Sequence, residues 1–327
     1  MTIPEHDCAE ILHKLYLIRE VDELIARRYP EGKMRCPVHL SVGQEGVPAA
    51  LAPLLRPDDR AVSTHRGHAH YLGKGGSLAA MMAEIYGRAG GCCAGRGGSM
   101  HLIDESVGFK GTTAIVGNSI PIGVGLALAQ SLRGGDAISV VFLGDGAVEE
   151  GAFYESANFA VVQGLPVLFM CENNLYSVYS SLEQRQPKGR VIHEMAAAMG
   201  LQTVAGDGND VAATYEGLKP AIASLRRRQG PVFAEFSTYR WREHCGPNFD
   251  NDIGYRSEQE FQKWLPLEPI ARFETYLLQS VGWSPERLKA IRDRVHDEIV
   301  TAFTWAEAQP FPDPETAYTD VYREATA

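Results

Sequence analysis

From Ile138 onward the sequence alternates between short strand-like segments and longer helix-like ones. The apolar segments ISVVFL, PVLFMC, LQTVAG and PVFAEFSTY predict strands. The segments GAFYESANFAVVQG, residues 192–199 and VAATYEGLKPAIASLRRRQG predict the helices between them. Strands and helices that alternate at these lengths favour an α/β fold, in which a parallel sheet is covered by helices on both faces.

The segments that flank this region predict further helices. Residues 7–25 carry apolar side chains at helical spacing with Asp7 as a candidate N-cap, which predicts an amphipathic surface helix. Residues 87–98 contain six glycines, so we expect an irregular, mobile loop there. The tail is helical in pattern and interrupted by prolines. We therefore expect one α/β domain over residues 1–256 and a helical C-terminal extension over residues 257–327.

Ser119 is also predicted to cap a helix, with Pro121 in its first turn. Gly123 and Ala127 lie one turn apart in it, and small residues at that spacing let another backbone approach closely. The partner is either the protein's own sheet or a second subunit, and both alternatives remain open at this point.

Composition limits the classes of function. The chain has 327 residues, of which 45% are hydrophobic and 22% charged, as in ordinary soluble globular proteins. Its net charge of −10, with Arg226–Arg228 as the one basic run, argues against nucleic acid as a partner. Neither a signal peptide nor a membrane-spanning apolar run is recognisable, so we expect no membrane association. The six cysteines include no C-x-x-C pair, and we expect reduced thiols in a cytoplasmic protein.

The strand ISVVFL ends abruptly at Gly144-Asp145-Gly146. Ligands of parallel α/β sheets bind beyond the carboxyl ends of the strands, and glycines let a ligand approach the backbone closely. The helix expected to follow would offer its N-terminal amides to an anion. A carboxylate beside such an anion site suggests a Mg²⁺ ion that bridges to phosphate groups.

The next strand ends in Glu172-Asn173-Asn174-Leu175-Tyr176. Two strand ends joined by one helix lie side by side in such a sheet, so an oxygen of Asn173 or Asn174 could reach a metal held by Asp145. Amide and carbonyl oxygens are hard neutral ligands that suit Mg²⁺. A second Gly-Asp-Gly at residues 206–208 has no asparagine pair at this spacing, and we predict that it is a structural turn.

The GDGA sequence followed by the asparagine pair resembles the thiamine diphosphate motif. The segment GDGAVEEGAFYESANFAVVQGLPVLFMCENNLYS is similar to the α subunit of the two-chain 2-oxo acid dehydrogenases, the E1 components of the pyruvate, branched-chain and acetoin types. STHRGHAHYLGKG, AGRGGSMH, IVGNSIPIGVGLALA, EFSTYRWREH and PDPETAYTDVY also have counterparts in the same order. The resemblance covers nearly the whole chain. It implies the thiamine diphosphate-binding fold, with a domain of the diphosphate type.

The resemblance also implies roles for individual residues. Asp145, the side chain of Asn174 and the carbonyl of Tyr176 would hold Mg²⁺, and His39, His68 and His244 would be catalytic. His65 and Arg66 would contact the diphosphate, and the backbone at Ala114 and Val116 would meet the aminopyrimidine ring. The full set of implied cofactor-binding residues is His65, Arg66, Ala114, Val116, Gly144, Asp145, Gly146, Ala147, Asn174, Tyr176 and His244.

A chain of this kind would decarboxylate a 2-oxo acid, or cleave acetoin, and pass the acyl unit to an acceptor such as a lipoyl group. The cofactor would lie between subunits, so we expect a separate β subunit that completes the site in an α2β2 assembly. A lipoyl acyltransferase is the expected further partner. Two departures concern specificity: Cys245 stands where a serine is expected, and His65 stands where pyruvate enzymes often have tyrosine, as in acetoin-type subunits.

Several alternatives remain open. A close variant would transfer the acyl unit to an aldehyde or ketone, as an acyloin-forming, transketolase-like ligase. A zinc cluster of His65, His68 and His70 lacks a cysteine or carboxylate to complete it. A nicotinamide-binding oxidoreductase is disfavoured because Leu128 and Met100 stand where the dinucleotide fingerprint needs glycine or alanine. A regulatory subunit without catalysis would not need the Asp145 and Asn174 pair.

Overall fold

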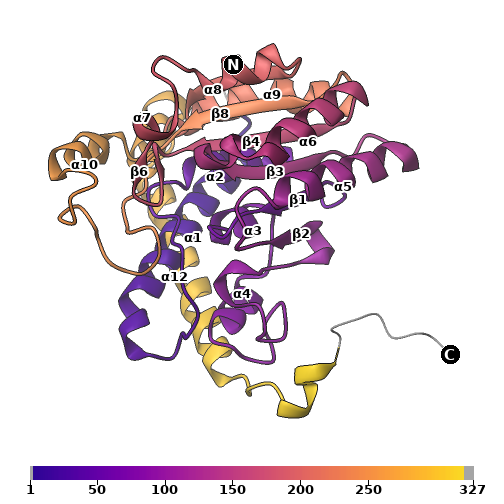
Figure 1. Ribbon diagram of the computed structural model, residues 1–327. Helices are drawn as coiled ribbons and strands as arrows, with labels where there is room; N and C mark the ends of the chain where they lie inside the picture. The colour runs from indigo at the N-terminus through magenta and orange to yellow at the C-terminus, as the bar shows by residue number, and fades with distance from the viewer. Residues whose placement is uncertain (1–2, 320–327) are drawn as a thin grey trace.

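The computed structural model describes residues 3–319 of the chain, and its centre is a six-stranded sheet (Figure 1). The strand order is β2-β1-β3-β4-β8-β7, and every pair of neighbours is parallel. The strands are β1 (Arg60–Ser63), β2 (Phe109–Thr112), β3 (Ser139–Gly144), β4 (Val167–Asn173), β7 (Gln202–Asp207) and β8 (Val232–Ser237). The predicted parallel α/β fold is confirmed, with β2 as a strand that the sequence pattern did not reveal.

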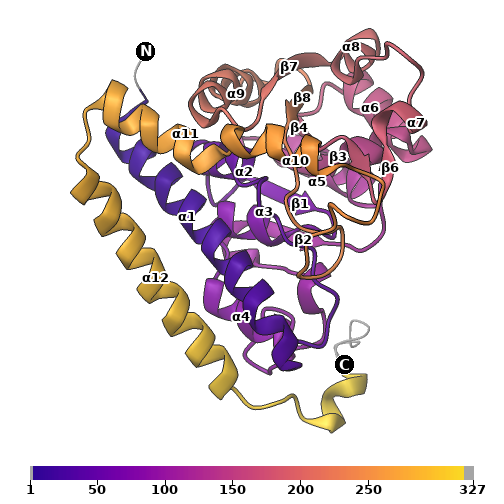
Figure 2. The same ribbon diagram turned by 90° about the vertical axis from the view of Figure 1, so that its left-hand side faces the viewer.

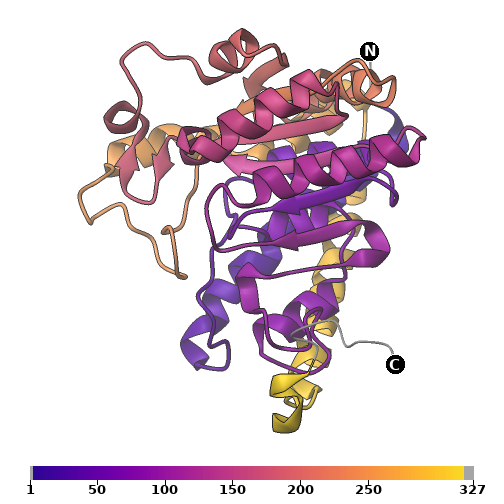
Figure 3. The same cartoon turned by 45° about the vertical axis from the view of Figure 1, so that its right-hand side comes forward.

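Helices cover both faces of the sheet. On one face lie α5 (Ser119–Arg133), α6 (Gly151–Val162) and α8 (Ile192–Ala198), of which α5 and α6 run side by side in Figure 3. The other helices are α1 (Glu5–Arg28), α2 (Gly46–Leu51), α3 (His68–Gly73), α4 (Leu78–Ile85), α7 (Leu182–Arg185), α9 (Val211–Arg226), α10 (Glu258–Trp264), α11 (Pro269–Tyr276) and α12 (Pro285–Ala308). Within residues 3–319, no helix is both long and apolar enough to cross a membrane.

The central strands are apolar throughout because both faces are covered. In β3, Val140 and Phe142 belong to one hydrophobic cluster, whereas Val141 and Leu143 belong to the cluster under α5 and α6. Successive side chains of a strand point to opposite faces, so a strand buried on both faces has no polar alternation. This explains the continuous apolar run that precedes Gly144.

The first helix is amphipathic, as predicted: Glu10 and Arg27 are exposed and its apolar face is buried. Ile11, Leu15 and Ile18 on α1 are fully buried, because α11 and α12 from the far end of the chain pack against it (Figure 2). The helix begins at Glu5 after Pro4, so Asp7 is not its N-cap; its carboxylate instead accepts a hydrogen bond from the Tyr215 hydroxyl.

Buried side chains of α11 and α12 belong to the same hydrophobic cluster as those of α1. Pro269 and Pro285 stand at the first positions of α11 and α12, where proline needs no backbone donor. The predicted boundary at residues 256 and 257 stays a prediction, and residues 320–327 of the expected extension lie outside the described part of the chain.

The glycine-rich loop at residues 87–98 is irregular, as expected, but it is tied to a buried anchor. Both carboxylate oxygens of Glu84 on α4 accept backbone hydrogen bonds from this loop, from Cys93 (2.7 Å), Gly95 (2.9 Å), Gly97 (2.6 Å) and Gly98 (3.0 Å). Glu84 is fully buried, so the loop provides most of the polar environment of its charge. These four hydrogen bonds hold the loop in place, so the predicted irregular structure is confirmed but the predicted mobility is not supported.

The small residues of α5 pack against the protein's own sheet. A Cβ atom on Gly123 would lie 2.2 Å from Cγ2 of Val141 and 2.9 Å from Cγ2 of Val62, and Ala127 is fully buried. The two alternatives for Gly123 and Ala127 are therefore decided in favour of packing on the sheet.

We predict that Gly123→Ala destabilises the protein by about 1–3 kcal/mol, because the added methyl group overpacks a close helix–sheet contact. The matched control is Gly125→Ala in the same helix, where a Cβ would meet no atom within 4 Å. That change should stabilise the helix by up to ~1 kcal/mol. Chemical denaturation of both variants tests this, and equal unfolding midpoints would contradict the packing argument.

Candidate active site

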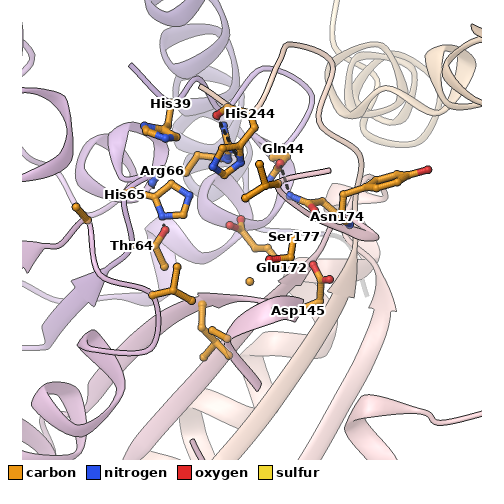
Figure 4. Close-up of a pocket in the computed structure, with 18 of the residues that line it drawn as sticks. His39, Gln44, Thr64, His65, Arg66, Asp145, Glu172, Asn174, Ser177 and His244 are labelled. Carbon is orange, nitrogen blue, oxygen red and sulfur yellow. Dashed lines mark hydrogen bonds between the residues drawn. The ribbon is translucent and has the colours of Figure 1, made fainter. Parts of the chain in front are cut away.

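A cavity of about 200 Å³ lies at the carboxyl ends of β1, β3 and β4 (Figure 4). The ladder pairs Gly144 at the end of β3 with Glu172 near the end of β4, so the two motifs that follow these strands reach the same place. After Asp145 the chain forms a short 3₁₀ helix (Asp145–Glu149) before α6 begins, in place of the α-helix expected directly after the strand.

The cavity collects the implied site residues with one exception, His68. Those that line it are His39, His65, Arg66, Ala114, Val116, Gly144, Asp145, Gly146, Ala147, Asn174, Tyr176 and His244. They come from six separate parts of the chain, and the parallel sheet brings them together.

Asp145 is almost completely buried, and burial raises the pKa of its carboxyl group. Its one ion-pair partner among the described residues is Arg185 on α7, which also contacts Glu149 at 2.5 Å. The guanidinium opposes the effect of burial on the pKa. The Asp145 carboxylate therefore has a cationic partner within the chain. No sequence motif had indicated Arg185 as part of this site.

The structure separates the two asparagines. The Asn173 amide donates to Glu235 at 2.8 Å on the far side of β4, whereas Asn174 lines the cavity and donates to Gln44 Oε1 at 3.0 Å. One cavity is therefore lined by Asp145, Asn174 and Tyr176. The carbonyl of Tyr176 as a third oxygen donor stays a prediction. These hard oxygen donors fit a Mg²⁺ ion.

Arg66 is a buried cation without a carboxylate partner in the described part of the chain. Its guanidinium donates to the carbonyl oxygens of Leu40 (2.6 Å) and His244 (3.1 Å), and burial lowers its pKa to about 9. A buried charge that is not neutralised is costly. The cavity therefore favours an anion next to Arg66, and a diphosphate is such an anion.

Three histidines form a cluster on the same side of the cavity. The ring centroids of His39, His65 and His244 lie 4.6–5.2 Å apart. Burial, helped by the charge of Arg66, lowers the pKa of His39 to about 2, of His65 to about 4 and of His244 to about 3. They are neutral at pH 7 in this environment, and a bound anion would raise their pKa values by favouring the charged forms.

His68 lies behind the cavity and is fully buried. Its Nδ1 is 2.7 Å from Asp22 Oδ1 and its Nε2 is 2.7 Å from Ser99 Oγ, while Asp22 also accepts a hydrogen bond from the Ser41 amide at 2.6 Å. The ring thus links α1, α3 and the end of the glycine-rich loop. Its catalytic role stays a prediction, and this placement is that of a positioning residue.

The cavity also contains residues that were not predicted as part of the site: Gln44, Thr64, His70, Met100, Leu143, Glu172, Ser177 and Val178. His70 Nε2 lies 2.8 Å from Glu172 Oε2, and its Nδ1 lies 2.6 Å from Ser63 Oγ. Since His65, His68 and His70 have three different surroundings, they do not form the zinc cluster considered as an alternative. Of these unpredicted residues, only Glu172 could have been found from the sequence, because it directly precedes the asparagine pair.

Comparison with known proteins identifies the family. The family model described as "Dehydrogenase E1 component" matches residues 13–315. The chain belongs to this family. The resemblance to E1 α subunits of thiamine diphosphate-dependent 2-oxo acid dehydrogenases, a group of oxidoreductases, is thereby confirmed.

Curated relatives support the same assignment of the E1 chain. The present chain is 35% identical over 308 residues to the pyruvate dehydrogenase E1 component subunit alpha of Rickettsia typhi. The alignment covers 94% of this chain and 93% of the relative. The corresponding subunit of Rhizobium meliloti is 34% identical over 319 residues, 97% of this chain and 90% of the relative. The chloroplastic alpha-3 subunit of Arabidopsis thaliana is 33% identical over 330 residues, 99% and 76% respectively.

We predict that the histidine cluster makes the protein less stable in mild acid. Below the ordinary histidine pKa of about 6.5, these histidines bind protons in the unfolded chain but not in the folded protein. Stability therefore falls as pH drops from about 6.5 toward the folded-state pKa values of His65 (about 4), His244 (about 3) and His39 (about 2). Replacing one of these residues, in His39→Gln, should reduce the fall.

Thermal unfolding at about pH 7.5 and about pH 5 measures this effect. His6→Gln is the control because that side chain is 82% exposed. If His39→Gln loses as much stability in acid as the unaltered protein, the lowered pKa of His39 does not contribute to the acid sensitivity.

Proposed function

We propose that this E1 chain binds thiamine diphosphate with Mg²⁺ in the cavity at the ends of β1, β3 and β4, as the α subunit of a dehydrogenase acting on a 2-oxo acid. The observation that carries the proposal is one cavity with two complementary halves. Arg66 offers a buried, unneutralised guanidinium, and Asp145 with Asn174 offers hard oxygen donors. A diphosphate bridged to a divalent cation satisfies both halves together.

When bound, thiamine diphosphate supplies a nucleophilic carbon and an electron sink for cleavage of a bond next to a carbonyl. The chain's own contribution is binding, orientation and proton handling. Arg66 presents a planar fork that matches phosphate oxygens. His39, His65 and His244 accept or hold protons once an anion has raised their pKa values toward neutrality.

Glycine makes room for the ligand beside Asp145. A Cβ on Gly144 would meet no protein atom within 4 Å, so open space lies beside Gly144. A Cβ on Gly146 would lie 2.8 Å from Ser177 Oγ, so the glycine there permits a close contact within the protein. We infer that the 3₁₀ turn after Asp145 offers its amides to the phosphate groups and that the backbone at Ala114 and Val116 contacts the aminopyrimidine ring.

The substrate that we propose is a 2-oxo acid; the relatives compared above are named for pyruvate, and acetoin remains a second candidate because His65 stands in the STHRGH sequence. A lipoyl group is the proposed acyl acceptor. Six free cysteines agree with the cytoplasmic location that we propose.

A separate β subunit is part of the proposal, in an α2β2 assembly. The outer face of α5 and α6 carries exposed apolar side chains, with Glu155 and Asn158 among them, and other described segments do not cover it (Figure 3). Exposed apolar patches mark protein interfaces. The apolar members of this face are Ile122 (48% exposed), Leu132 (80%), Phe159 (42%) and Val162 (70%). Ile115 and Val116 extend it to the cavity, so a partner bound there would reach the site.

We predict that Asp145→Asn weakens Mg²⁺-dependent binding of thiamine diphosphate at least about tenfold, through the loss of a charged ligand. The matched control is Asp207→Asn in the second Gly-Asp-Gly, whose carboxylate pairs with Arg272 at 2.7 Å outside the cavity. Isothermal titration of the assembled protein measures both affinities. Equal affinity in the two variants would refute the assignment of Asp145.

We predict that Val162→Glu prevents association with the β subunit, because it places a charge in an apolar interface. Val300→Glu is the control, since Val300 is 46% exposed on α12, away from this face. Affinity purification from the native cells, followed by mass spectrometry, identifies the partner and its loss. A homo-oligomer that retains the cofactor without a second polypeptide would contradict the two-subunit proposal.

A further inference from the structure

We propose that Cys92 and Cys93 form a redox-active site, at which a hydroperoxide joins the two adjacent thiols in a reversible disulfide. Both residues are half-buried in the glycine-rich loop at residues 87–98. Their sulfur atoms and a carboxylate oxygen of Glu84 all lie within 4.8 Å of one another. The chain turns at the pair, since the amide of Ala94 donates to the carbonyl oxygen of Gly91 at 2.9 Å. The two thiols therefore need only small movements to meet.

The carboxylate beside the two thiols is not free to hold a metal ion with them. Both oxygens of Glu84 accept backbone hydrogen bonds, from Cys93 and Gly95 on one oxygen and from Gly97 and Gly98 on the other. These bonds occupy the lone pairs of the carboxylate. A metal in this cluster would keep only two sulfur ligands, whereas structural zinc sites have four ligands. The cluster therefore favours chemistry of the thiols themselves.

The two thiols differ in how readily they lose a proton. The hydrogen bond from Cys92 lowers the pKa of the Cys93 thiol, whereas the same bond and burial raise the pKa of Cys92. In its thiol form Cys93 donates to the carbonyl oxygen of His101 at 2.9 Å, so only part of the population is thiolate at neutral pH. The thiolate is the reactive form, and redox-sensing cysteines are accessible and lie next to a resolving cysteine. Cys93 is therefore the attacking residue and Cys92 the resolving one.

The reaction balances with a hydroperoxide such as hydrogen peroxide as the oxidant. The Cys93 thiolate attacks one peroxide oxygen and the O–O bond breaks, which leaves a sulfenic acid on Cys93. The released hydroxide takes up the proton that Cys93 had lost and becomes water. The sulfur of Cys92 then attacks the sulfur of Cys93, and the hydroxyl group leaves with the Cys92 proton as a second water. Two electrons pass from the two thiols to the peroxide, and one S–S bond forms.

A disulfide between neighbouring residues is strained. Their Cα atoms lie about 3.8 Å apart across a trans peptide, whereas disulfides ordinarily join Cα atoms about 4.4–6.8 Å apart. Strained disulfides are easily reduced, so the bond is reversible. The strained peptide carries the amide of Cys93, which donates to Glu84 at 2.7 Å. We therefore expect oxidation to weaken this anchor and to loosen the glycine-rich loop.

The test is a titration of the full-length chain with hydrogen peroxide, followed by alkylation of the remaining thiols and tryptic digestion. Cleavage after Arg88 and Arg96 releases residues 89–96, whose only cysteines are Cys92 and Cys93. We expect this peptide to lose ~2 Da and to escape alkylation, and dithiothreitol to restore both thiols. Cys245→Ser is the control, because it removes an exposed thiol elsewhere and should leave the change intact.

Single variants separate the roles of the two thiols. Cys93→Ser should abolish the mass change, whereas Cys92→Ser should stop at a sulfenic acid on Cys93 that dimedone labels. A disulfide from either residue to Cys36, or no disulfide in residues 89–96, would overturn the inference. Circular dichroism confirms that each variant folds, and an alanine replacement takes the place of a serine variant that does not fold.

Brief exposure of the native protein to trypsin tests the loosening of the loop. We expect cleavage at Arg96 to be at least about threefold faster after oxidation, because local opening exposes the backbone to the protease. Equal rates in the oxidised and reduced protein would overturn this part of the inference. None of these measurements involves the cofactor, so they test the thiol site independently of the proposed function.

Discussion

The parallel ladder between β3 and β4 is the interaction on which the rest of the structure depends. Its register places Gly144 opposite Glu172, so the turns that follow the two strands open into one cavity. Strands that ran antiparallel would send these turns to opposite edges of the sheet. Continuous apolar side chains on both faces keep the two strands in the interior, where their ends are shielded from water.

Within this frame, buried charges position the loops that complete the cavity. Asp250 is nearly inaccessible and pairs with Arg256 and, at 3.4 Å, with Arg240, while the Tyr255 hydroxyl donates to it at 2.6 Å. This network holds the loop that carries His244. Among residues 3–319, Arg66 has no such carboxylate partner. The contrast separates a guanidinium that supports the fold from one that faces a ligand.

Local patterns predicted much of the fold because they depend on neighbouring residues. The apolar run into Gly144, the interruption of the helical tail at Pro269 and Pro285, and the spacing of the asparagine pair all hold in the structure. The amphipathic pattern of the first helix was predicted, but not that α11 and α12 from the far end of the chain bury its Ile11 and Leu15. An amphipathic pattern cannot reveal a cover contributed more than 250 residues later.

The sequence by itself determined the fold class, the family and the residue types of the site, because strand periodicity and motif spacing are written along the chain. Only the tertiary structure decided which members of each motif face the ligand. Glu172 lines the cavity and Asn173 does not, since adjacent residues of β4 point to opposite faces. Asn174, which also lines the cavity, follows the end of that strand. Arg185 against Asp145, and the approach of His39 to His244, likewise depend on contacts between segments distant in sequence, which a linear pattern does not encode.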